Sequence, residues 1–211
     1  MQRTLAAAGL LALVLAAAPS RATDAPVGTV HLSPAPGVSF DLPKNWIACD
    51  DATNKLLNGM DDPRNLRASV CVTIAGVSYN LRAFNPILFH TMSMLVAYHV
   101  EQDISPADLA ALTPEIITTI TPAVCDEIGK PLTTDGTKID SCVVAVGTFG
   151  GHQALVSTVV ATAPEGGDFQ IDIYEVPYDK GYVQVQFNAV SLLKKITLPE
   201  EQAIMASFHI D

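Results

Sequence analysis

The segment that decides the fold is residues 142–188, which reads CVVAVGTFGGHQALVSTVVATAPEGGDFQIDIYEVPYDKGYVQVQFN. Apolar side chains recur there at every second position, which is the period of a β-strand rather than of a helix. Gly150-Gly151 interrupts the first half of the segment, and Asp179-Lys180-Gly181 interrupts the second half. Both interruptions are typical of tight turns, so the segment predicts two consecutive β-hairpins.

The two predicted hairpins differ in the distribution of their apolar residues. In the first hairpin, residues 142–148 and 153–162 are largely apolar on both faces. In the second hairpin, residues 169–174 and 182–188 alternate apolar residues with Gln, Asp and Tyr. A strand pair that is apolar on both faces is typical of the covered centre of a sheet. The sequence therefore predicts a central first hairpin and a more peripheral second hairpin.

A long helical pattern precedes the hairpins. Ser105-Pro106 supplies a capping hydroxyl followed by proline, which is a typical helix start. Apolar residues then recur at spacings of three and four, and Pro114 and Pro122 interrupt this stripe. The pattern predicts a kinked or twice-started helix over residues 106–128, ended by Gly129-Lys130-Pro131. A second, shorter helix is predicted to begin at Pro199, after the hairpins, and we expect the two helices to cover opposite faces of the sheet.

The N-terminal part of the chain predicts shorter elements. Residues 38–42 alternate as a strand, and residues 46–49 form a second short strand. Residues 52–59 are typical of a brief helix, and residues 69–75 alternate as another strand. Residues 90–100 fit a strand or a helix, because their periodicity does not decide between the two.

The first residues are typical of a cleavable secretory signal. Arg3 is followed by an uninterrupted apolar run over residues 5–18, and then by Pro19 and the small-residue exit Ser20-Arg21-Ala22. The run is shorter than the roughly 20 residues that span a bilayer as a helix. We therefore expect residues 1–22 to be removed from a periplasmic or secreted protein, with a retained membrane anchor as the alternative.

The rest of the chain is predicted to be one domain. Residues 23–36 contain several prolines and predict an irregular leader, and residues 37–211 predict a single folded unit. Residues 1–22 contain two arginines and no acid, so their removal takes the formal charge from −10 to −12. A surface that acidic repels nucleic acid and anionic lipid, so we expect neither nucleic acid nor, after cleavage, a membrane as a partner.

The four cysteines, Cys49, Cys71, Cys125 and Cys142, all follow the predicted cleavage site. An even number of cysteines in an exported chain predicts disulfides. Three pairings are possible, and the order along the chain favours Cys49–Cys71 and Cys125–Cys142. The competing idea is a zinc site, which needs a closely spaced pair such as C-x-x-C that the sequence lacks.

Two segments carry a resemblance to a known family. In residues 37–46, GVSFDLPKNW, a strand with an aromatic residue runs into a proline and then a tryptophan; residues 182–187, YVQVQF, precede a short helix that reaches Ser207-Phe208. These features resemble the PsbP-like superfamily, which includes PsbP, the Ran-binding Mog protein and DcrB-like exported bacterial proteins. The resemblance covers most of the mature chain, although residues 76–104 match poorly. It implies an α/β (α+β) fold in which helices sandwich an antiparallel β-sheet on both faces. It carries no shared catalytic centre and implies a role as an assembly factor, adaptor or chaperone.

Two groups of side chains could hold a metal ion. His90, Met92 and Met94 form a soft ligand set suited to Cu(I), although methionines among apolar neighbours also fill cores. Asp50-Asp51 and Asp61-Asp62 could hold Ca²⁺, but they lack the regular alternation of oxygen ligands in a calcium loop. A solvated acidic rim is the alternative for these aspartates.

Catalytic patterns are weak throughout the sequence. Ser157, Ser207 and His152 offer hydroxyls and a base, but the sequence contains no G-x-S-x-G elbow and no H-E-x-x-H pair. Gly166-Gly167 lies beside Glu165 and Asp168, whose charge is wrong for a phosphate cradle. We therefore assign no catalytic, cofactor-binding or metal-binding residue and expect no cofactor.

The expected function is binding of another protein, as a non-enzymatic assembly factor, accessory subunit or chaperone. One alternative is an immunity-type inhibitor that neutralises a basic toxin through the acidic surface. Others are a small periplasmic hydrolase and a copper-handling protein. A deep pocket that converges on charged side chains would favour the hydrolase, and an exposed apolar patch would favour the binding protein.

Overall fold

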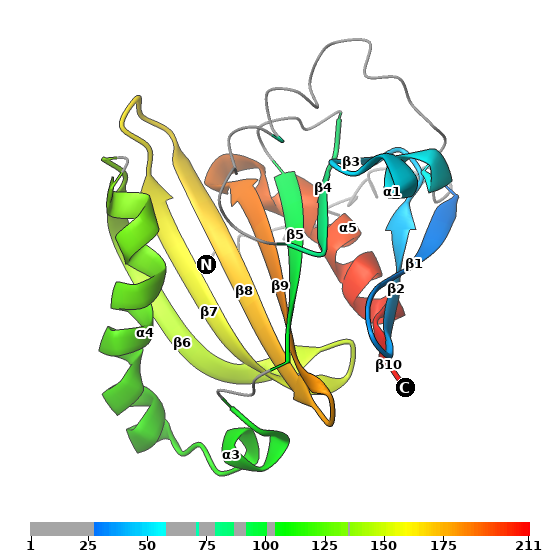
Figure 1. The fold of residues 1–211 in the computed structure, drawn as a ribbon. Helices are drawn as coiled ribbons and strands as arrows, with labels where there is room; N and C mark the ends of the chain where they lie inside the picture. Colours follow the sequence, from blue (N-terminus) through cyan, green and yellow to red (C-terminus); the bar gives the residue numbers. More distant parts are fainter. Residues whose placement is uncertain (1–27, 58–70, 72–78, 87–91, 101–103, 135) are drawn as a thin grey trace, which may run out of the picture.

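The computed structural model describes residues 28–57, 71, 79–86, 92–100, 104–134 and 136–211 (Figure 1). These residues form two antiparallel sheets with helices against them. The larger sheet has seven strands in the order β3 (Ile47–Ala48), β4 (Leu81–Phe84), β5 (Met92–His99), β9 (Gly181–Val190), β8 (Asp168–Tyr178), β7 (His152–Thr162) and β6 (Lys138–Phe149). The smaller sheet has the order β1 (Thr29–Ala35), β2 (Val38–Pro43) and β10 (His209–Ile210). The helical elements are α1 (Asp51–Leu56), α3 (Pro106–Ala110), α4 (Pro114–Thr134), the 3-10 turn η1 (Ser191–Leu193) and α5 (Lys194–Ser207).

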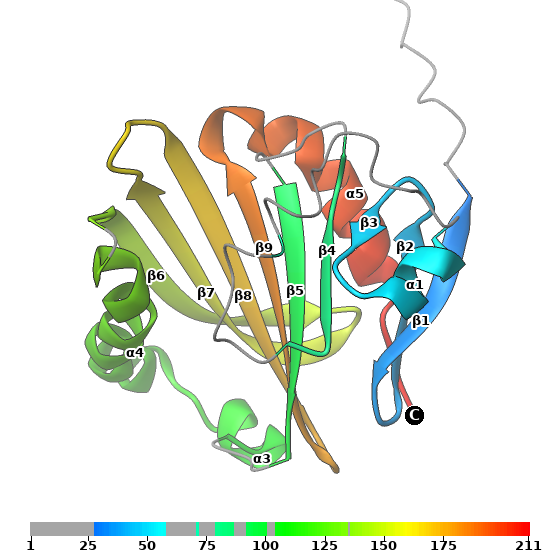
Figure 2. The same ribbon diagram turned by 45° about the horizontal axis from the view of Figure 1, so that its top comes forward.

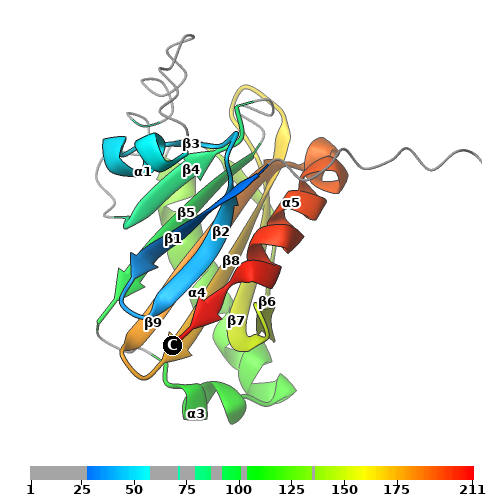
Figure 3. The same cartoon turned by 90° about the vertical axis from the view of Figure 1, so that its right-hand side faces the viewer.

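Helices lie on both faces of the large sheet, as predicted. Neighbouring residues of a strand point to opposite faces. Asp172 of β8 bonds Lys194 of α5, whereas the adjacent Ile171 packs with Ile128 of α4. The small sheet shares the face of α5, and Figure 3 shows both on the same side of the large sheet. The α/β (α+β) arrangement of an antiparallel sheet between helices is confirmed.

Both predicted hairpins are present. A two-residue turn joins β6 to β7, with Phe149 opposite His152, and Gly150 and Gly151 adopt φ of 57° and 84° there. Positive φ at both central residues is the backbone of a type I′ turn, which glycine adopts without steric cost. β8 and β9 are joined in the same way, with Tyr178 opposite Gly181.

The predicted places of the hairpins in the sheet are wrong. β8 and β9 lie in the middle of the large sheet, whereas β6 of the first hairpin is its edge. Polar residues of the second hairpin bond neighbouring side chains of the sheet: the amide of Asn188 donates to Ser93 Oγ of the adjacent strand β5 at 3.0 Å, and the amide of Gln186 donates to Asn188 Oδ1 of its own strand at 2.7 Å. Alternation of polar and apolar residues therefore does not mark an edge strand in this sheet.

The long helical segment is twice-started, as predicted. α3 begins at a capping box between Ser105 and Asp108, and α4 begins at Pro114. Its predicted end at Gly129-Lys130-Pro131 is wrong, because α4 continues to Thr134. Gly129 is buried in the helix rather than ending it, and a β-carbon there would lie 3.6 Å from Ile139 Cγ1 of β6. This is an ordinary van der Waals distance, so an alanine would also fit between the helix and the sheet.

The predicted irregular leader over residues 23–36 is wrong in its second half. Residues 29–35 form strand β1, which pairs with β2 from Thr29 opposite Pro43 to Ala35 opposite Val38. The register shifts between Leu32 and Ala35, around Pro34. Proline lacks the N–H of a regular ladder, so it is tolerated at such an irregularity on an edge strand. Residues 23–27 and the predicted signal over residues 1–22 lie outside the described residues.

The other predicted elements have mixed outcomes. The strands over residues 38–42 and 46–49 and the helix near residues 52–59 are present as β2, β3 and α1. The ambiguous segment over residues 90–100 contains strand β5. The predicted strand over residues 69–75 lies outside the described residues except for Cys71, which is in a helical conformation.

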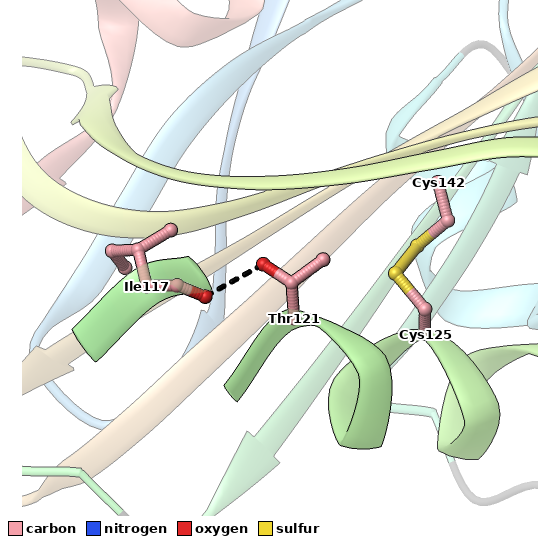
Figure 4. Close-up of a disulfide and its surroundings, with 4 residues drawn as sticks. All are labelled: Ile117, Thr121, Cys125 and Cys142. Carbon is pink, nitrogen blue, oxygen red and sulfur yellow. Dashed lines mark hydrogen bonds between the residues drawn. A yellow bond between two sulfur atoms is a disulfide. The ribbon is translucent and has the colours of Figure 1, made fainter. Parts of the chain in front are cut away.

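Both favoured disulfides are present in the structure. Cys49 bonds Cys71, and Cys125 bonds Cys142. The second bond joins α4 to the edge strand β6, as Figure 4 shows. One turn before Cys125, the hydroxyl of Thr121 donates to the carbonyl oxygen of Ile117 at 2.7 Å (Figure 4). The disulfide therefore fixes the middle of α4 to the outer strand of the sheet.

Candidate binding surface

The inner side of α5 is polar along its first two turns. Lys194, Thr197 and Glu201 follow one another at spacings of three and four, which places them on one side of a helix. Lys194 Nζ lies 2.6 Å from Asp172 Oδ2 of β8 and 2.6 Å from Glu201 Oε2. Asp172 and Glu201 are almost completely buried. The start of α5 is thus attached to the sheet by ionic contacts rather than by apolar ones.

Neighbouring polar groups complete this buried cluster. Asp172 Oδ1 accepts hydrogen bonds from Thr158 at 2.8 Å and from Gln170 at 2.9 Å, and Glu201 Oε1 accepts one from Thr197 at 3.3 Å. Two carboxylates share one ammonium, so the cluster keeps a formal negative charge. Tyr174 lies nearby, and its burial, reinforced by the charges of Asp172 and Glu201, raises its pKa to about 12.

A second contact fixes α5 near strands β3 and β4 of the large sheet. Glu200 Oε2 accepts hydrogen bonds from Trp46 Nε1 at 3.1 Å and from Asn85 Nδ2 at 2.7 Å. Trp46 is fully buried. Because Glu200 and Glu201 are both held, the rotation of α5 about its own axis is determined at this turn.

The outer side of the same segment is apolar. Leu192, Ile196 and Leu198 are 88%, 60% and 40% exposed, and the exposed Lys195 lies among them in the sequence. We name Leu192 and Ile196, which are four residues apart and therefore lie on one side of the segment, the η1–α5 patch. Leu198 lies two residues after Ile196 in α5, so it points to another side of the helix. Charged residues face inward here and apolar residues face water, which reverses the usual arrangement of a surface helix. Clustered exposed apolar side chains are typical of interaction sites.

Neither the patch nor the buried cluster was predicted from the sequence. The helix was predicted to begin at Pro199, whereas α5 begins five residues earlier at Lys194. A signal was present in the sequence, because Leu192 and Ile196 are four residues apart and Lys194, Thr197 and Glu201 follow helical spacing. The adjacent Lys194-Lys195 pair hides this signal, since lysine is rarely buried.

Of the predicted copper ligands His90, Met92 and Met94, only Met94 has a described side chain. Met94 is fully buried in the main core. His90 and the side chain of Met92 lie outside the described part of the structure. Met94 is therefore core filler, one of the two roles that its apolar surroundings predicted.

Of the predicted calcium ligands, only Asp50 and Asp51 lie among the described residues. Asp50 Oδ1 accepts a hydrogen bond from the backbone N–H of Thr53 at 2.6 Å, so Asp50 caps α1. Asp51 is exposed, and Asp61 and Asp62 lie outside the described residues. In the described part of the chain, no group of three or more His, Cys, Asp or Glu side chains could hold a metal ion.

Ser157, Ser207 and His152, the residues considered for catalysis, each make different structural contacts. Ser157 is buried in β7, on the α4 face of the sheet, opposite Ile173. Ser207 Oγ accepts the backbone N–H of Asp41 at 2.9 Å and donates to the carbonyl oxygen of Ile204 at 2.8 Å. The ring of His152 lies edge-on to Phe208. Gly166 and Gly167 adopt positive φ in the turn between β7 and β8.

Two hollows lie on the described surface. One, of about 410 Å³, is lined by residues that include His31, His209 and Asp211. Both imidazoles are exposed, and each lies beside a carboxylate. His31 Nδ1 is 3.0 Å from Asp41 Oδ1 of the neighbouring strand β2, and His209 Nε2 is 3.2 Å from Asp211 Oδ1, two residues further along the chain. The other hollow, of about 340 Å³, lies beside the Cys49–Cys71 disulfide. Neither contains a buried charged side chain among its lining residues.

None of the helices in the described part of the chain is long and apolar enough to cross a bilayer.

Comparison with known proteins gives a fold. No family model matches the chain, and no curated protein matches it. Among solved structures, it is similar to cyanobacterial PsbP (CyanoP) from Synechocystis sp. PCC 6803, with a TM-score of 0.52 and 11% identity over 91% of this chain and 98% of that one. The chain has a PsbP-like fold. This fold confirms the resemblance that residues 37–46 and 182–187 indicate.

Two further solved structures are more distant. The Ran-binding protein Mog1p of Saccharomyces cerevisiae has a TM-score of 0.43 and 10% identity over 87% of this chain and 96% of that one. LpqN of Mycobacterium tuberculosis, described as involved in cell envelope biogenesis, has a TM-score of 0.38 and 11% identity over 87% of this chain and 90% of that one. Likeness at this level supports no functional argument, so function has to be argued from the surface of this chain.

Proposed function

We propose that the chain is an exported, non-catalytic domain that binds another protein through the η1–α5 patch. The observation that carries this proposal is the reversed polarity of the segment. Burying Lys194 with Asp172 and Glu201 costs desolvation, whereas turning Leu192 and Ile196 inward would gain apolar burial. An arrangement that forgoes this gain is understandable if the apolar side chains are covered by a partner.

The patch is held in a fixed position before any partner arrives. Asp172 of β8 holds Lys194, and Trp46, directly before β3, holds Glu200. A rigid surface loses little conformational entropy on binding, and this favours affinity. The segment can therefore present Leu192 and Ile196 without first folding around its partner.

The chemistry of the partner follows from the composition of the patch. Two neighbouring apolar side chains, Leu192 and Ile196, need an apolar surface opposite them, and Lys195 favours a carboxylate at its border. The proposed partner is thus a protein with an apolar contact surface flanked by acidic residues. Buried interface cores exclude charge, so an aspartate introduced within the patch should weaken binding strongly.

The proposed compartment is the periplasm or the extracellular space. The N-terminal residues are typical of a secretory signal, and two disulfides suit an oxidising compartment. The same proposal takes residues 37–211, together with strand β1, as a single domain. The proposal includes no enzymatic role, since the described residues offer no convergent set of reactive groups.

The test is site-specific photo-crosslinking in the native cell from position Leu192, with Leu56 of α1 as the control. Both leucines are strongly exposed, at 88% and 59%, and they lie on different elements. We expect one protein to be crosslinked from position 192 and not from position 56. The variant Leu192→Asp/Ile196→Asp should then weaken binding of that protein more than tenfold, while Leu56→Asp binds normally.

These variants should leave folding intact, because substitutions at exposed positions usually change the free energy of unfolding by less than about 0.5 kcal/mol. Equal crosslinking from both positions, or normal binding by the double aspartate variant, would refute the η1–α5 patch as the binding surface.

A further inference from the structure

The outer edge of β6 is a second surface that the proposed function does not use. β6 is the terminal strand of the large sheet, and among the described residues it pairs only with β7. It runs for 12 residues, Lys138–Phe149. An open strand edge presents a row of backbone N–H and C=O groups that another strand can bond.

The hairpin geometry determines which backbone groups face outward. The two-residue turn makes Phe149 and His152 a hydrogen-bonded pair. Bonded and non-bonded pairs alternate along an antiparallel ladder, so residues 143, 145 and 147 bond β7. The N–H and C=O groups of residues 142, 144, 146 and 148 therefore point to the open edge.

This edge lacks the features that usually prevent strands from pairing. Residues 141–148 read SCVVAVGT and contain no charge and no proline. Val143 is 59% exposed and Val146 is 38% exposed, on opposite faces of the strand. Natural edges are commonly blocked by charged residues, proline or bulges, and the bulge of β6 lies before this segment, between Ile139 and Ser141.

α4 is incompletely covered along the same edge. Figures 1 and 2 show α4 running beside β6 at the outer end of the sheet. Gly129 is its only buried residue within the described range. Every apolar residue of the stripe toward β6 stays half-buried: Ile117, Ile120, Val124, Ile128 and Leu132. Ile116 is 42% exposed. Apolar surface thus remains partly exposed on both α4 and β6 along the same edge of the sheet.

We infer that this edge pairs with the same edge of a second copy of the chain, β6 antiparallel to β6, to give a two-fold symmetric dimer with one continuous sheet of twice seven strands. A symmetric antiparallel pair requires an edge that is compatible with itself. With the axis near Val144, Val143 lies opposite Ala145 and Cys142 opposite Val146. Asp140 lies opposite Thr148, so no like charges face each other.

Symmetry also determines where the helices lie. The two-fold axis of an antiparallel edge pair stands perpendicular to the sheet, so α4 of both copies is on the same face. The two α4 helices then lie side by side and cover the half-buried stripe and Ile116 of each other. The other occupant of such an edge, an unrelated extended peptide, would cover the strand but leave the helix as it is.

The test combines sedimentation of the purified, disulfide-bonded chain with amide hydrogen exchange. We expect a dimer whose dissociation constant rises at least tenfold in Val143→Lys, because lysine on an edge strand opposes pairing. Leu56→Lys is the matched control, an exposed apolar residue of α1, and should leave the dimer unchanged. Val146→Lys tests the other face of the strand in the same way.

Hydrogen exchange distinguishes strand pairing from other contacts. The amides of residues 142, 144, 146 and 148 should be protected in the dimer and exchange quickly in Val143→Lys. The amides of residues 143 and 145 should stay protected in both, which also shows that the variant is folded. A monomer at the highest soluble concentration would overturn the inference, as would a dimer that Val143→Lys does not weaken. A dimer that Leu192→Asp dissociates would overturn it too, without affecting whether the η1–α5 patch binds a partner.

Discussion

The two ends of the large sheet are covered in different ways. At the β4–β5–β9 end, the small sheet and α5 enclose one large core, in which the aromatic side chains of Phe40, Trp46 and Phe187 are fully buried. This core extends along one face of the sheet as far as Phe149, the last residue of β6. At the β6–β7 end, α3 and α4 enclose two small clusters, one around Val159 and Ile171 and one around Leu109, Val144 and Leu155. The same sheet thus has a well-packed end and a thinly covered end.

The helices at the two ends, α5 and α4, are attached to the sheet by different interactions. α5 has no covalent bond to the sheet and is fixed by its buried ionic cluster and by Ile204 in the core. α4 buries little apolar surface and is bonded to β6 through Cys125–Cys142. A disulfide stabilises a fold mainly by limiting the freedom of the unfolded chain, so it suits a helix whose packing is insufficient on its own.

The largest effect that we expect comes from emptying the well-packed end. Phe187→Ala should lower the free energy of unfolding by about 3–5 kcal/mol, because it removes a fully buried ring that contacts Phe149 and Tyr174. Ile117→Ala on the half-buried side of α4 should cost only about 1 kcal/mol. Urea unfolding of both variants measures the two values. Equal losses would show that the two ends are equally well packed.

The next effect concerns the covalent bond at the thin end. Cys125→Ser with Cys142→Ser should lower the free energy of unfolding by about 3 kcal/mol, as expected for opening a loop of this size. In addition, the amides of α4 should exchange much faster than those of β8 and β9, since the helix can then separate without global unfolding.

The matched control is Cys49→Ser with Cys71→Ser, which opens a loop of similar length, 22 residues against 17. It should cost a similar free energy of unfolding but leave exchange in α4 unchanged. If α4 stays as protected as the central strands in the Cys125/Cys142 variant, its packing is stronger than its half-buried stripe indicates.

The sequence predicts those parts of the fold that depend on local chemistry. Gly150-Gly151 requires a tight turn, Ser105 and Asp108 form a capping box, and apolar alternation marks the strands, so these elements follow from residue type. The order of strands in the sheet does not follow in this way. Val143 and Val146 are as apolar as central residues, and only the three-dimensional structure shows that, within the described part of the chain, their strand has no outer neighbour.

Two further features could not be predicted from the alternation of residues along the chain. Asp140 forms a bulge that keeps Ile139 on the face of α4, and a one-residue shift of this kind is invisible in the alternation pattern. The η1–α5 patch depends on Lys194 turning inward, which needs Asp172, a residue 22 positions away. A charged side chain is buried only where an oppositely charged partner lies close in space, and that partner can be distant in the sequence. The candidate surface could therefore not be derived from local patterns.

The smallest effect that we predict is the response of the well-packed end to alkali. Burial raises the pKa of Tyr174 to about 12, and the charges of Asp172 and Glu201 add to the shift. The ring is neutral in the folded state while the unfolded chain, whose tyrosines have a pKa near 10, already loses its proton. The folded state thus binds more protons, and its stability falls as the pH rises from about 10 to about 12. Tyr174 should contribute at most about 2 kcal/mol to this fall.

Tyr174→Phe isolates this contribution. Tyr178, whose pKa is also raised to about 12 by burial, remains as a second titrating ring. The variant should therefore lose stability between pH 10 and 12 less steeply than the wild type, as measured by urea unfolding at a series of pH values. Exchange in α4, at the other end of the sheet, should not change with this substitution. An unaltered pH dependence would mean that Tyr174 loses its proton as easily in the folded chain as in the unfolded one, and the contact between the main core and the buried ionic cluster would then be open to water.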